Sequence, residues 1–338
     1  MPPTGGGMEI FMNIVYIATD SYVSMLGISL FSLLENNKSM EQLSIYILST
    51  NLSQTNQNVL RQMADPYHRQ LHFLQIGDYQ RAFSADTNTS GFHPIVLARL
   101  LLTRYLPLEV HTVLYLDCDT IIHGSLDTME PADFCKTEYA FAAVPEVYMP
   151  SAQKSFIGLA EKDIYYNCGV LLINMDYWRR QELCQSFIDY YTQMNGKLMY
   201  NDQDILNHCC QGHILTLSQT YNFAPVLYYF PYYFIRKYQP AYKISSRTKY
   251  KEIIRHPSII HYLGEERPWV HGNFSPYRKV YDSYKARTPW KDTPMIYGKE
   301  KVLFCYHILN LITAAFPWFR RLFTKCIGIR YYQFTKKD

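Results

Sequence analysis

The feature that most constrains this chain is an alternation of short apolar runs with amphipathic segments near its start. Residues 23–35 carry apolar side chains at helical spacing, and Ser53 is suited to cap a second helix that runs to about Met63. The runs that flank these helices predict buried strands, and they are Asn13–Thr19, Leu43–Leu48 and Leu71–Ile76. Strands that alternate with helices predict an α/β fold with a mostly parallel twisted sheet, which binds ligands at the carboxyl ends of its strands.

The pattern continues into the middle of the chain. A helix is expected over Ile95–Leu106, closed by Pro107, and residues 145–166 suggest a loop with a short helix. Further strands are expected at Thr112–Leu116, Ala140–Val144, Val170–Asn174 and Ser258–Leu263, and further helices at Asp176–Gln193 and Asp202–Cys210.

The chain changes character after about Tyr221. Tyr, Phe and Pro crowd Tyr221–Tyr242 without clear periodicity, which favours irregular structure folded over the sheet and suited to binding an acceptor. We therefore expect a disordered leader at residues 1–11, one catalytic α/β domain at 12–285, and a basic, aromatic, amphipathic helical tail at 286–338.

Charge is concentrated in that tail. The net charge is +4, and residues 320–338 contain six Lys or Arg against one Asp. Residues 302–319 are largely apolar, and three roles were open for them: a helix lying on an anionic membrane surface, a membrane span, or a packed core helix. The first is favoured, because His307, Asn310, Thr313 and Pro317 interrupt the run. No nucleic-acid partner is expected.

The eight cysteines show no zinc-binding spacing, and the N-terminus lacks a secretory signal pattern. These observations predict free thiols in a reducing compartment. We expect a cytoplasmic protein, peripheral on the inner face of the cell membrane.

Asp117 and Asp119 stand at the end of the apolar strand Thr112–Leu116. Residues i and i+2 of a strand share a face, so both carboxylates can reach one hard divalent cation at the strand end. A solvated turn is the alternative for an isolated Asp-X-Asp. Burial of the preceding strand favours the metal site.

A second feature lies at the end of the last predicted strand. His261 is a candidate metal ligand, although a lone histidine on an apolar strand is more often a core residue. Gly264 permits close backbone approach, and Arg267 provides a permanent cation suited to phosphate. Together these residues predict a clamp for a metal ion and a diphosphate.

Three further features are weaker alone. Tyr200–Asp204 fits an acidic helix start, Asn167–Val170 is a polar step into a strand, and Arg99 fits a surface or ion-paired position.

In order along the chain, the motifs resemble glycosyltransferase family 8, which includes bacterial lipopolysaccharide glucosyl- and galactosyltransferases and glycogenins. The resemblance covers roughly residues 12–285. The residues that carry it are Ala18–Tyr22 (Ala-Thr-Asp-Ser-Tyr), Leu97–Leu100 (Leu-Ala-Arg-Leu), Val113–Asp119 (Val-Leu-Tyr-Leu-Asp-Cys-Asp), Tyr165–Asn174 (Tyr-Tyr-Asn-Cys-Gly-Val-Leu-Leu-Ile-Asn), Asn201–Asn207 (Asn-Asp-Gln-Asp-Ile-Leu-Asn) and His261–Trp269 (His-Tyr-Leu-Gly-Glu-Glu-Arg-Pro-Trp).

The resemblance implies a GT-A fold, a UDP-hexose donor, Mn²⁺ with Mg²⁺ as an alternative, and retention of anomeric configuration. It implies that Asp117, Asp119 and His261 hold the metal. The donor-binding residues that it implies are Ala18, Thr19, Asp20, Tyr22, Arg99, Asp117, Cys118, Asp119, Asn167, Cys168, Asp202, Gln203, His261, Gly264 and Arg267. The chain departs from the usual family pattern at Thr19, Cys168 and Arg267, where an acid, a small Ala or Ser, and Lys are common.

The implied catalytic residues are Gln203, Asp202 and Asp204. Gln203 falls where a nucleophile would be expected, but an amide is a poor one, so front-face attack is favoured and Asp202 and Asp204 are the fallback nucleophiles. The expected function is transfer of glucose or galactose from a UDP-sugar to a glycan or glycolipid acceptor. The alternatives are a nucleotidyltransferase, which would normally need a basic Gly-rich loop after the first strand, and an inactive sugar-nucleotide-binding protein.

Overall fold

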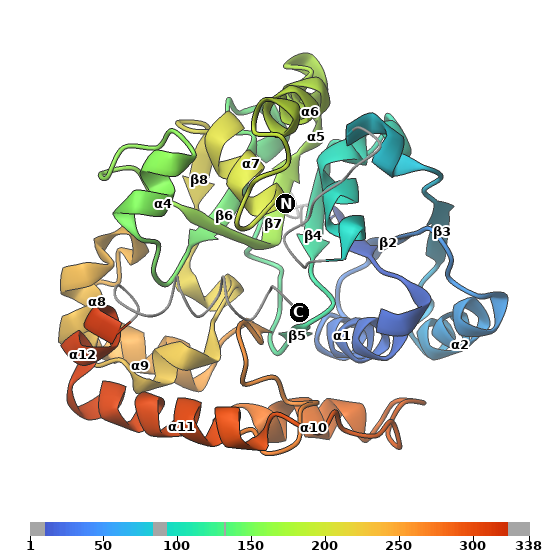
Figure 1. The fold of residues 1–338 in the computed structure, drawn as a ribbon. Coiled ribbons are helices and arrows are strands. Elements are labelled where there is room, and N and C mark those ends of the chain that lie inside the picture. The colour runs from blue at the N-terminus through green and yellow to red at the C-terminus, as the bar shows by residue number, and fades with distance from the viewer. Residues whose placement is uncertain (1–10, 84–92, 132, 324–338) are drawn as a thin grey trace, which may run out of the picture.

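A computed structural model describes residues 11–83, 93–131 and 133–323. The mixed α/β prediction is confirmed: a central, mostly parallel sheet is flanked by helices (Figure 1). The strands are β1 Phe11–Ile17, β2 Gln42–Ser49, β3 Leu71–Gln75, β4 Thr112–Leu116, β5 Thr120–Ile122, β6 Phe141–Pro145, β7 Tyr166–Asn174, β8 Ile214–Thr216 and β9 Ile259–His261.

The helices cover both faces of this sheet. They are α1 Val23–Asn36, α2 Gln54–Ala64, α3 Leu102–Tyr105, α4 Ser151–Phe156, α5 Met175–Arg180, α6 Leu183–Gln193, α7 Asp202–Cys209, α8 Tyr232–Tyr238, α9 Arg247–Arg255, α10 Arg278–Lys285, α11 Glu300–Ala315 and α12 Pro317–Phe323.

The main sheet has the strand order β3-β2-β1-β4-β7-β6-β8. All its neighbouring strands pair in parallel except at β7, which is antiparallel to both β4 and β6. β1 shows how one strand serves two cores: Ile14 and Tyr16 face one apolar cluster, while Val15 and Ile17 face the other. The first cluster lies under α1 and α9, and the second lies under α6 and α7.

A separate two-stranded sheet pairs β5 with β9 in antiparallel register, and Thr120 lies opposite His261. β5 was not predicted, because only three residues form it. This small sheet has the largest consequence for the site, since it joins the turn after β4 to a segment about 140 residues further along the chain.

Two helix predictions need correction. The segment expected as a helix over Ile95–Leu106 is mainly a 3₁₀ helix, Pro94–Leu101, followed by the short α3. The single helix expected over Asp176–Gln193 is wrong, because Glu182 adopts φ 49° in the left-handed region and divides α5 from α6.

The aromatic segment Tyr221–Tyr242 is only partly irregular. It contains α8 and short 3₁₀ helices at Pro225–Tyr229 and Pro240–Tyr242. The leader predicted at residues 1–11 lies outside the described residues except for Phe11, which begins β1.

The C-terminal segment forms two helices that meet at Phe316 and Pro317, where the apolar run was expected to break. Leu303, Asn310 and Thr313 of α11 are buried against the domain, and Phe304 and Leu311 are more than half exposed. In the described ranges, no helix combines the length and apolar character needed to cross a bilayer. Most of the basic tail, residues 324–338, lies outside the described residues.

Candidate metal and sugar-nucleotide site

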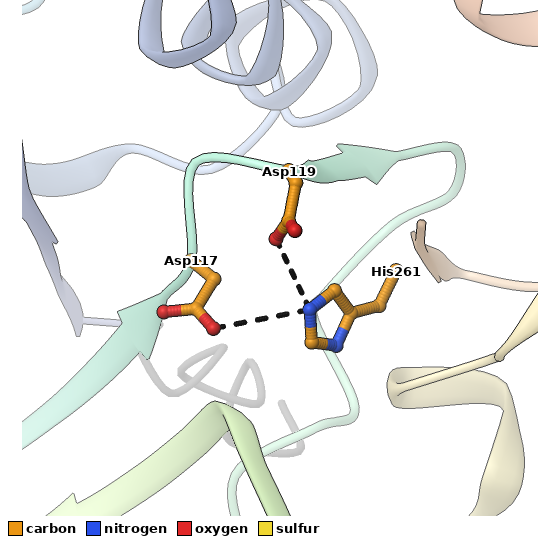
Figure 2. A group of neighbouring side chains, drawn as sticks. All are labelled: Asp117, Asp119 and His261. Atoms are coloured by element: carbon orange, nitrogen blue, oxygen red, sulfur yellow. Dashed lines mark ion pairs between the residues drawn. The ribbon is translucent and has the colours of Figure 1, made fainter. Parts of the chain in front are cut away.

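The acidic pair lies in the turn between β4 and β5. The Asp117 backbone N–H donates to the Gly169 carbonyl of β7 at 2.8 Å, and the Asp119 carbonyl accepts from the Tyr262 N–H at 3.0 Å. Asp117 is thus fixed to the main sheet and Asp119 to the small one. Pairing of β5 with β9 then brings His261 between the two carboxylates (Figure 2).

These three side chains form a group able to hold a metal ion, with one ligand atom from each lying within 4.8 Å of the others. His261 Nε2 lies 3.1 Å from Asp119 Oδ1 and 3.8 Å from Asp117 Oδ2 (Figure 2). Two carboxylate oxygens and an imidazole suit a divalent cation such as Mn²⁺. The donor set therefore fits the metal that the sequence predicted.

The two oxygens of Asp117 have different partners. Oδ1 accepts hydrogen bonds from the Arg99 guanidinium at 2.9 Å and from the Tyr115 hydroxyl at 2.6 Å. Oδ2 faces His261 instead. Because Oδ1 is already satisfied, Oδ2 is the oxygen available to a cation.

The charges of this group depend on one another. Burial by itself lowers the pKa of His261, but the nearby carboxylates of Asp119 and Asp117 outweigh it and raise that pKa overall. Burial likewise raises the pKa of Asp119, and His261 and Arg267 reverse this effect and lower it. These charges favour an ionised Asp119, which is the form of the acid that binds cations, beside a protonated His261, from which a bound metal ion would displace the proton.

Gly169 provides the space that this arrangement needs. A Cβ built on Gly169 would lie 2.0 Å from His261 Cε1 and 2.8 Å from Asp117 Oδ2. Any side chain there would displace a metal-ligand candidate, so glycine is required by close approach. The sequence marked the segment Asn167–Val170 but gave no reason for this residue.

Arg99 is buried rather than at the surface. Its Nε lies 2.9 Å from Asp202 Oδ2, and it also pairs with Asp117 and stacks over the Tyr115 ring. Burial raises the pKa of Asp202 to about 6, even though Arg99 acts in the opposite direction. Arg99 therefore links the acid of the metal group to the acid at the start of α7.

A cavity of about 400 Å³ joins these groups, a size typical of small-molecule sites. Of the predicted site residues, those that line it are Ala18, Thr19, Tyr22, Arg99, Asp117, Cys118, Asp119, Asn167, Cys168, Asp202, Gln203, His261, Gly264 and Arg267. The structure thus brings together residues from distant parts of the chain.

Two predicted site residues lie outside this lining. The Asp20 carboxylate accepts hydrogen bonds from the Ser53 N–H and the Asn56 side chain, so it anchors the start of α2. Asp204 is fully buried and accepts from Tyr165, Gln153 and the Tyr200 N–H. Neither carboxylate is presented to the cavity. The assignments of Asp20 as a donor ligand and of Asp204 as a nucleophile stay predictions, and the structure gives each carboxylate a structural role.

Sequence reasoning missed several groups of the site. Glu146, just after β6, lines the cavity and accepts from Asn167 Nδ2 at 2.8 Å. His93, Tyr148 and Trp269 also line it, and Asn222 lies behind His261. Glu146 and Asn222 sit in segments without a distinctive pattern, so only their placement reveals them.

Burial disfavours the thiolate form of both cysteines of the site. Burial raises the pKa of Cys118 and of Cys168 well above the ordinary value. The Cys118 thiol donates to the Ile17 carbonyl at 3.5 Å. The described cysteines are all free, as the sequence predicted.

Comparison with known proteins identifies sequences and a structure that are similar to this chain. The family model for glycosyl transferase family 8 matches residues 13–272. A glycosyltransferase-like protein of Haemophilus influenzae is 30% identical over 218 residues, a match that spans 63% of this chain and 64% of that protein. A lipopolysaccharide 1,2-glucosyltransferase of Escherichia coli is 28% identical, with 83% of this chain and 80% of the relative covered.

The fold is also that of a solved enzyme. The galactosyltransferase LgtC, whose structure was determined with donor and acceptor sugar analogues, superposes with a TM-score of 0.66. The match covers 82% of this chain and 96% of LgtC at 23% identity, which shows a common fold.

Proposed function

The chain belongs to glycosyltransferase family 8, and from this premise we propose that it transfers glucose or galactose from a UDP-sugar to a glycan or glycolipid acceptor with retention of configuration. The observation that carries the proposal is that Asp117, Asp119 and His261 share one cavity with Asn167, Asp202 and Gln203. In this proposal the candidate cation site and the groups that would bind the sugar are adjacent, as transfer from a sugar diphosphate requires.

Asp117, Asp119 and His261 would hold Mn²⁺, with Mg²⁺ as the alternative. A divalent ion there would supply positive charge against the diphosphate of the leaving group. Arg267, which lines the same cavity, provides a second cation that needs no metal. Stabilisation of a developing anion is commonly the largest single catalytic contribution.

The groups at the sugar side favour front-face attack. The Gln203 side-chain oxygen accepts the Cys168 N–H at 2.9 Å, so this amide is held in place and is a weak nucleophile. Asp202 is ion-paired with Arg99, which reduces its nucleophilicity while leaving it able to accept sugar hydroxyls. In this mechanism the departing phosphate takes the proton of the acceptor hydroxyl.

The acceptor class rests on the relatives. Lipopolysaccharide 1,2-glucosyltransferase and 1,3-galactosyltransferase are names of proteins that this chain resembles at 28% and 22% identity. We propose a lipid-linked glycan acceptor, with the aromatic segment Tyr221–Tyr242 contributing to its binding. The donor hexose, glucose or galactose, is left to the assay.

A membrane-surface position would suit such an acceptor. Phe304, Leu311 and Trp318 of α11 and α12 are each more than half exposed, and basic residues follow them in the sequence. An apolar face flanked by cations favours binding to anionic lipid. We therefore propose that α11, α12 and the basic tail place the protein peripherally on the inner face of the cell membrane.

The principal experiment measures release of UDP from a panel of UDP-sugars with and without Mn²⁺. We expect release from UDP-glucose or UDP-galactose that excess chelator abolishes. Full hydrolysis in chelator would contradict the metal assignment. Binding of UDP-sugars without any release would favour an inactive sugar-nucleotide-binding protein, and release of pyrophosphate from nucleoside triphosphates would favour a nucleotidyltransferase.

Two further measurements address the finer parts of the proposal. A glycosyl adduct trapped on Asp202 would contradict front-face attack. For the membrane role, Trp318→Ser with Phe319→Ser should reduce sedimentation with phosphatidylglycerol vesicles relative to the unsubstituted protein. Equal partition of both proteins would contradict a role for this face, and Tyr297→Ser, at an exposed residue outside the two helices, is the control.

A further inference from the structure

A continuous chain of side-chain hydrogen bonds runs from the metal group to the sugar side of the cavity. His261 Nδ1 is bonded to Asn222 Oδ1 at 2.9 Å, and Asn222 Nδ2 donates to Asn167 Oδ1 at 2.8 Å. Asn167 Nδ2 in turn donates to Glu146 Oε2 at 2.8 Å, an oxygen that Gln203 Nε2 also approaches at 3.5 Å. These residues come from separate segments of the chain, so the connection exists only in the folded protein.

The donor and acceptor of each hydrogen bond follow from the orientation of the Asn167 amide. An ionised carboxylate only accepts, so Glu146 requires the amide nitrogen of Asn167 to face it. The Gly169 N–H donates to Asn167 Oδ1 at 3.0 Å, which sets the same orientation independently. Asn222 must then direct its nitrogen at Asn167 and its oxygen at His261.

This orientation has a consequence for the imidazole. The Asn222 oxygen accepts a hydrogen bond from the N–H at His261 Nδ1, so the lone pair of neutral His261 lies on Nε2. Nε2 is the atom that faces Asp117 and Asp119. A metal-binding histidine normally donates its other ring N–H to such a partner, which fixes the tautomer and ring orientation.

Asn222 itself is 3% exposed and is not among the residues that line the cavity. Its backbone neighbourhood is held without its side chain, because the Phe223 N–H donates to the Ile259 carbonyl and the His261 N–H donates to the Phe223 carbonyl. Substitution of the Asn222 side chain should therefore leave the pairing of this segment with β9 intact.

We propose that Asn222 is a positioning residue that aligns the metal-binding imidazole through its oxygen and the sugar-side amides through its nitrogen. The proposal has two parts. The first, which we call the metal limb, is the alignment of His261 by the Asn222 oxygen, and it rests on the metal group alone. The second, the sugar limb, is the alignment of Asn167 by the Asn222 nitrogen, and it rests on the proposed function. The two limbs can be tested separately, because a substitution can change the oxygen or the nitrogen of the Asn222 amide.

Two variants separate these ends. Asn222→Leu removes both contacts, and we expect Mn²⁺ affinity to fall by about 10- to 100-fold, measured by titration calorimetry with Mn²⁺ alone. Asn222→Asp keeps an acceptor for His261 but places a carboxylate against Asn167 Oδ1. For this variant we expect Mn²⁺ affinity at least as high as that of the original protein, with a fall in kcat for UDP-hexose hydrolysis of about tenfold or more.

The outcomes are distinguishable from failure of the proposed function. Unchanged Mn²⁺ affinity in Asn222→Leu would overturn the metal limb, whether or not any UDP-sugar is hydrolysed. Parallel losses of Mn²⁺ affinity and kcat in Asn222→Asp, or no loss of kcat, would overturn the separation of the two ends. Should Asn222→Leu fail to fold, by its melting temperature, Asn222→Asp decides alone. Mn²⁺ binding without hydrolysis of any UDP-sugar by the original protein would contradict the proposed function and not the metal limb.

Discussion

Two parts of the cavity lining, which we call the metal end and the loop end, are held in different ways. At the metal end, His261 is 2% exposed and the main sheet, the small sheet and Asn222 fix the three ligand candidates. The loop end is the nearby segment Gly264–Arg267, in which Gly264 is exposed with φ 80° and Arg267 Nε donates to the Gly264 carbonyl at 3.1 Å. The first end belongs to the core of the fold, and the second is a surface loop.

The loop is held by the C-terminal helices. Glu266 accepts from Asn310 Nδ2 of α11 at 2.8 Å, and Asn310 accepts from Arg320 of α12 at 2.7 Å. Lys299, just before α11, also pairs with Glu265 at 2.9 Å. The difference between the ends teaches that the candidate metal site is built by the two sheets, whereas the loop Gly264–Arg267 is held by contacts with a segment outside the region that the family model matches.

The largest effect is expected at the metal end. Asp119→Asn removes one of two acidic ligand candidates with little change of shape, and we expect kcat/KM to fall by about 1,000-fold, or ~4 kcal/mol of barrier. Steady-state kinetics with saturating Mn²⁺ measure it. Asp127→Asn, at an exposed carboxylate outside the cavity lining, is the control. A loss below tenfold would show that this end is not the metal site.

Gly169→Ala tests whether the metal end is as closely packed as the structure indicates. The added Cβ must displace His261 or Asp117, so we expect a loss of at least about 100-fold in kcat/KM together with weaker Mn²⁺ binding. Gly77→Ala is the matched control, because a Cβ there meets no atom within 4 Å. Wild-type kinetics in Gly169→Ala would mean that this end is flexible, which would remove the contrast between the two ends.

At the loop end, Arg267→Ala removes a cation and should lower kcat/KM by about 10- to 100-fold. The loss is smaller than at the metal end, because solvent and the metal ion compensate in part for a partly exposed charge. Arg267→Lys keeps the charge and should recover most of the activity, as the site then needs charge more than a forked geometry. If Arg267→Lys were as poor as Arg267→Ala, the loop end would be as geometrically demanding as the metal end.

Asn310→Leu tests the hold of α11 on the loop. Loss of the hydrogen bond to Glu266 should raise the KM for the UDP-sugar several-fold, change kcat little, and destabilise the fold by about 1–3 kcal/mol, because a buried acid loses one of its hydrogen bonds. Donor titrations and thermal melts measure both effects. Leu311→Ala, on the exposed face of α11, is the control. An unchanged KM would show that the loop holds its position without α11.

The smallest effect is a pH dependence of stability at Glu266. Burial raises the pKa of this carboxyl to about 7, above its ordinary value near 4.5. The folded protein therefore retains a proton that the unfolded chain releases, so stability decreases as pH rises from about 4.5 to 7. We expect a contribution of roughly 1–2 kcal/mol.

Glu266→Gln should remove this contribution while keeping an acceptor for Asn310. Melting temperatures of the two proteins between pH 5 and pH 8 give the comparison, and the variant should gain stability relative to the original protein as pH rises. Parallel curves would mean that Glu266 is solvated, as an exposed loop would allow, and that α11 does not bury it.

Much of the site could be predicted because its polar residues stand at recognisable positions in local sequence patterns. Asp117 and Asp119 follow an apolar strand, and His261 ends another, so each side chain could be placed at a strand end by periodicity. The strand–helix alternation likewise indicated the sheet and most of its order of elements. Such patterns involve only residues that are close together in the sequence, so they can be recognised in one sequence without a structure.

The sequence does not distinguish the surroundings of residues of similar type. Asp20, Asp202 and Asp204 are all acids beside predicted motifs, but only Asp202 lines the cavity. Asp20 accepts hydrogen bonds from Ser53 and Asn56 at the start of α2, and Asp204 is surrounded by donors from α4, the residue before β7 and the segment before α7. Those donors lie up to about 50 residues away along the sequence, so the residues next to either acid do not indicate its structural role.

The sequence by itself therefore determined the class of fold and the candidate ligands from local spacing and residue type, and it indicated the family through the resemblance of its ordered motifs. Only the tertiary structure decided that β5 pairs with β9 and so brings His261 to the two acids. It alone also joined Glu146, Asn167 and Asn222 and set α11 against the loop Gly264–Arg267. These contacts connect residues far apart in the chain, and their geometry arises from packing of the whole molecule, which no short segment encodes.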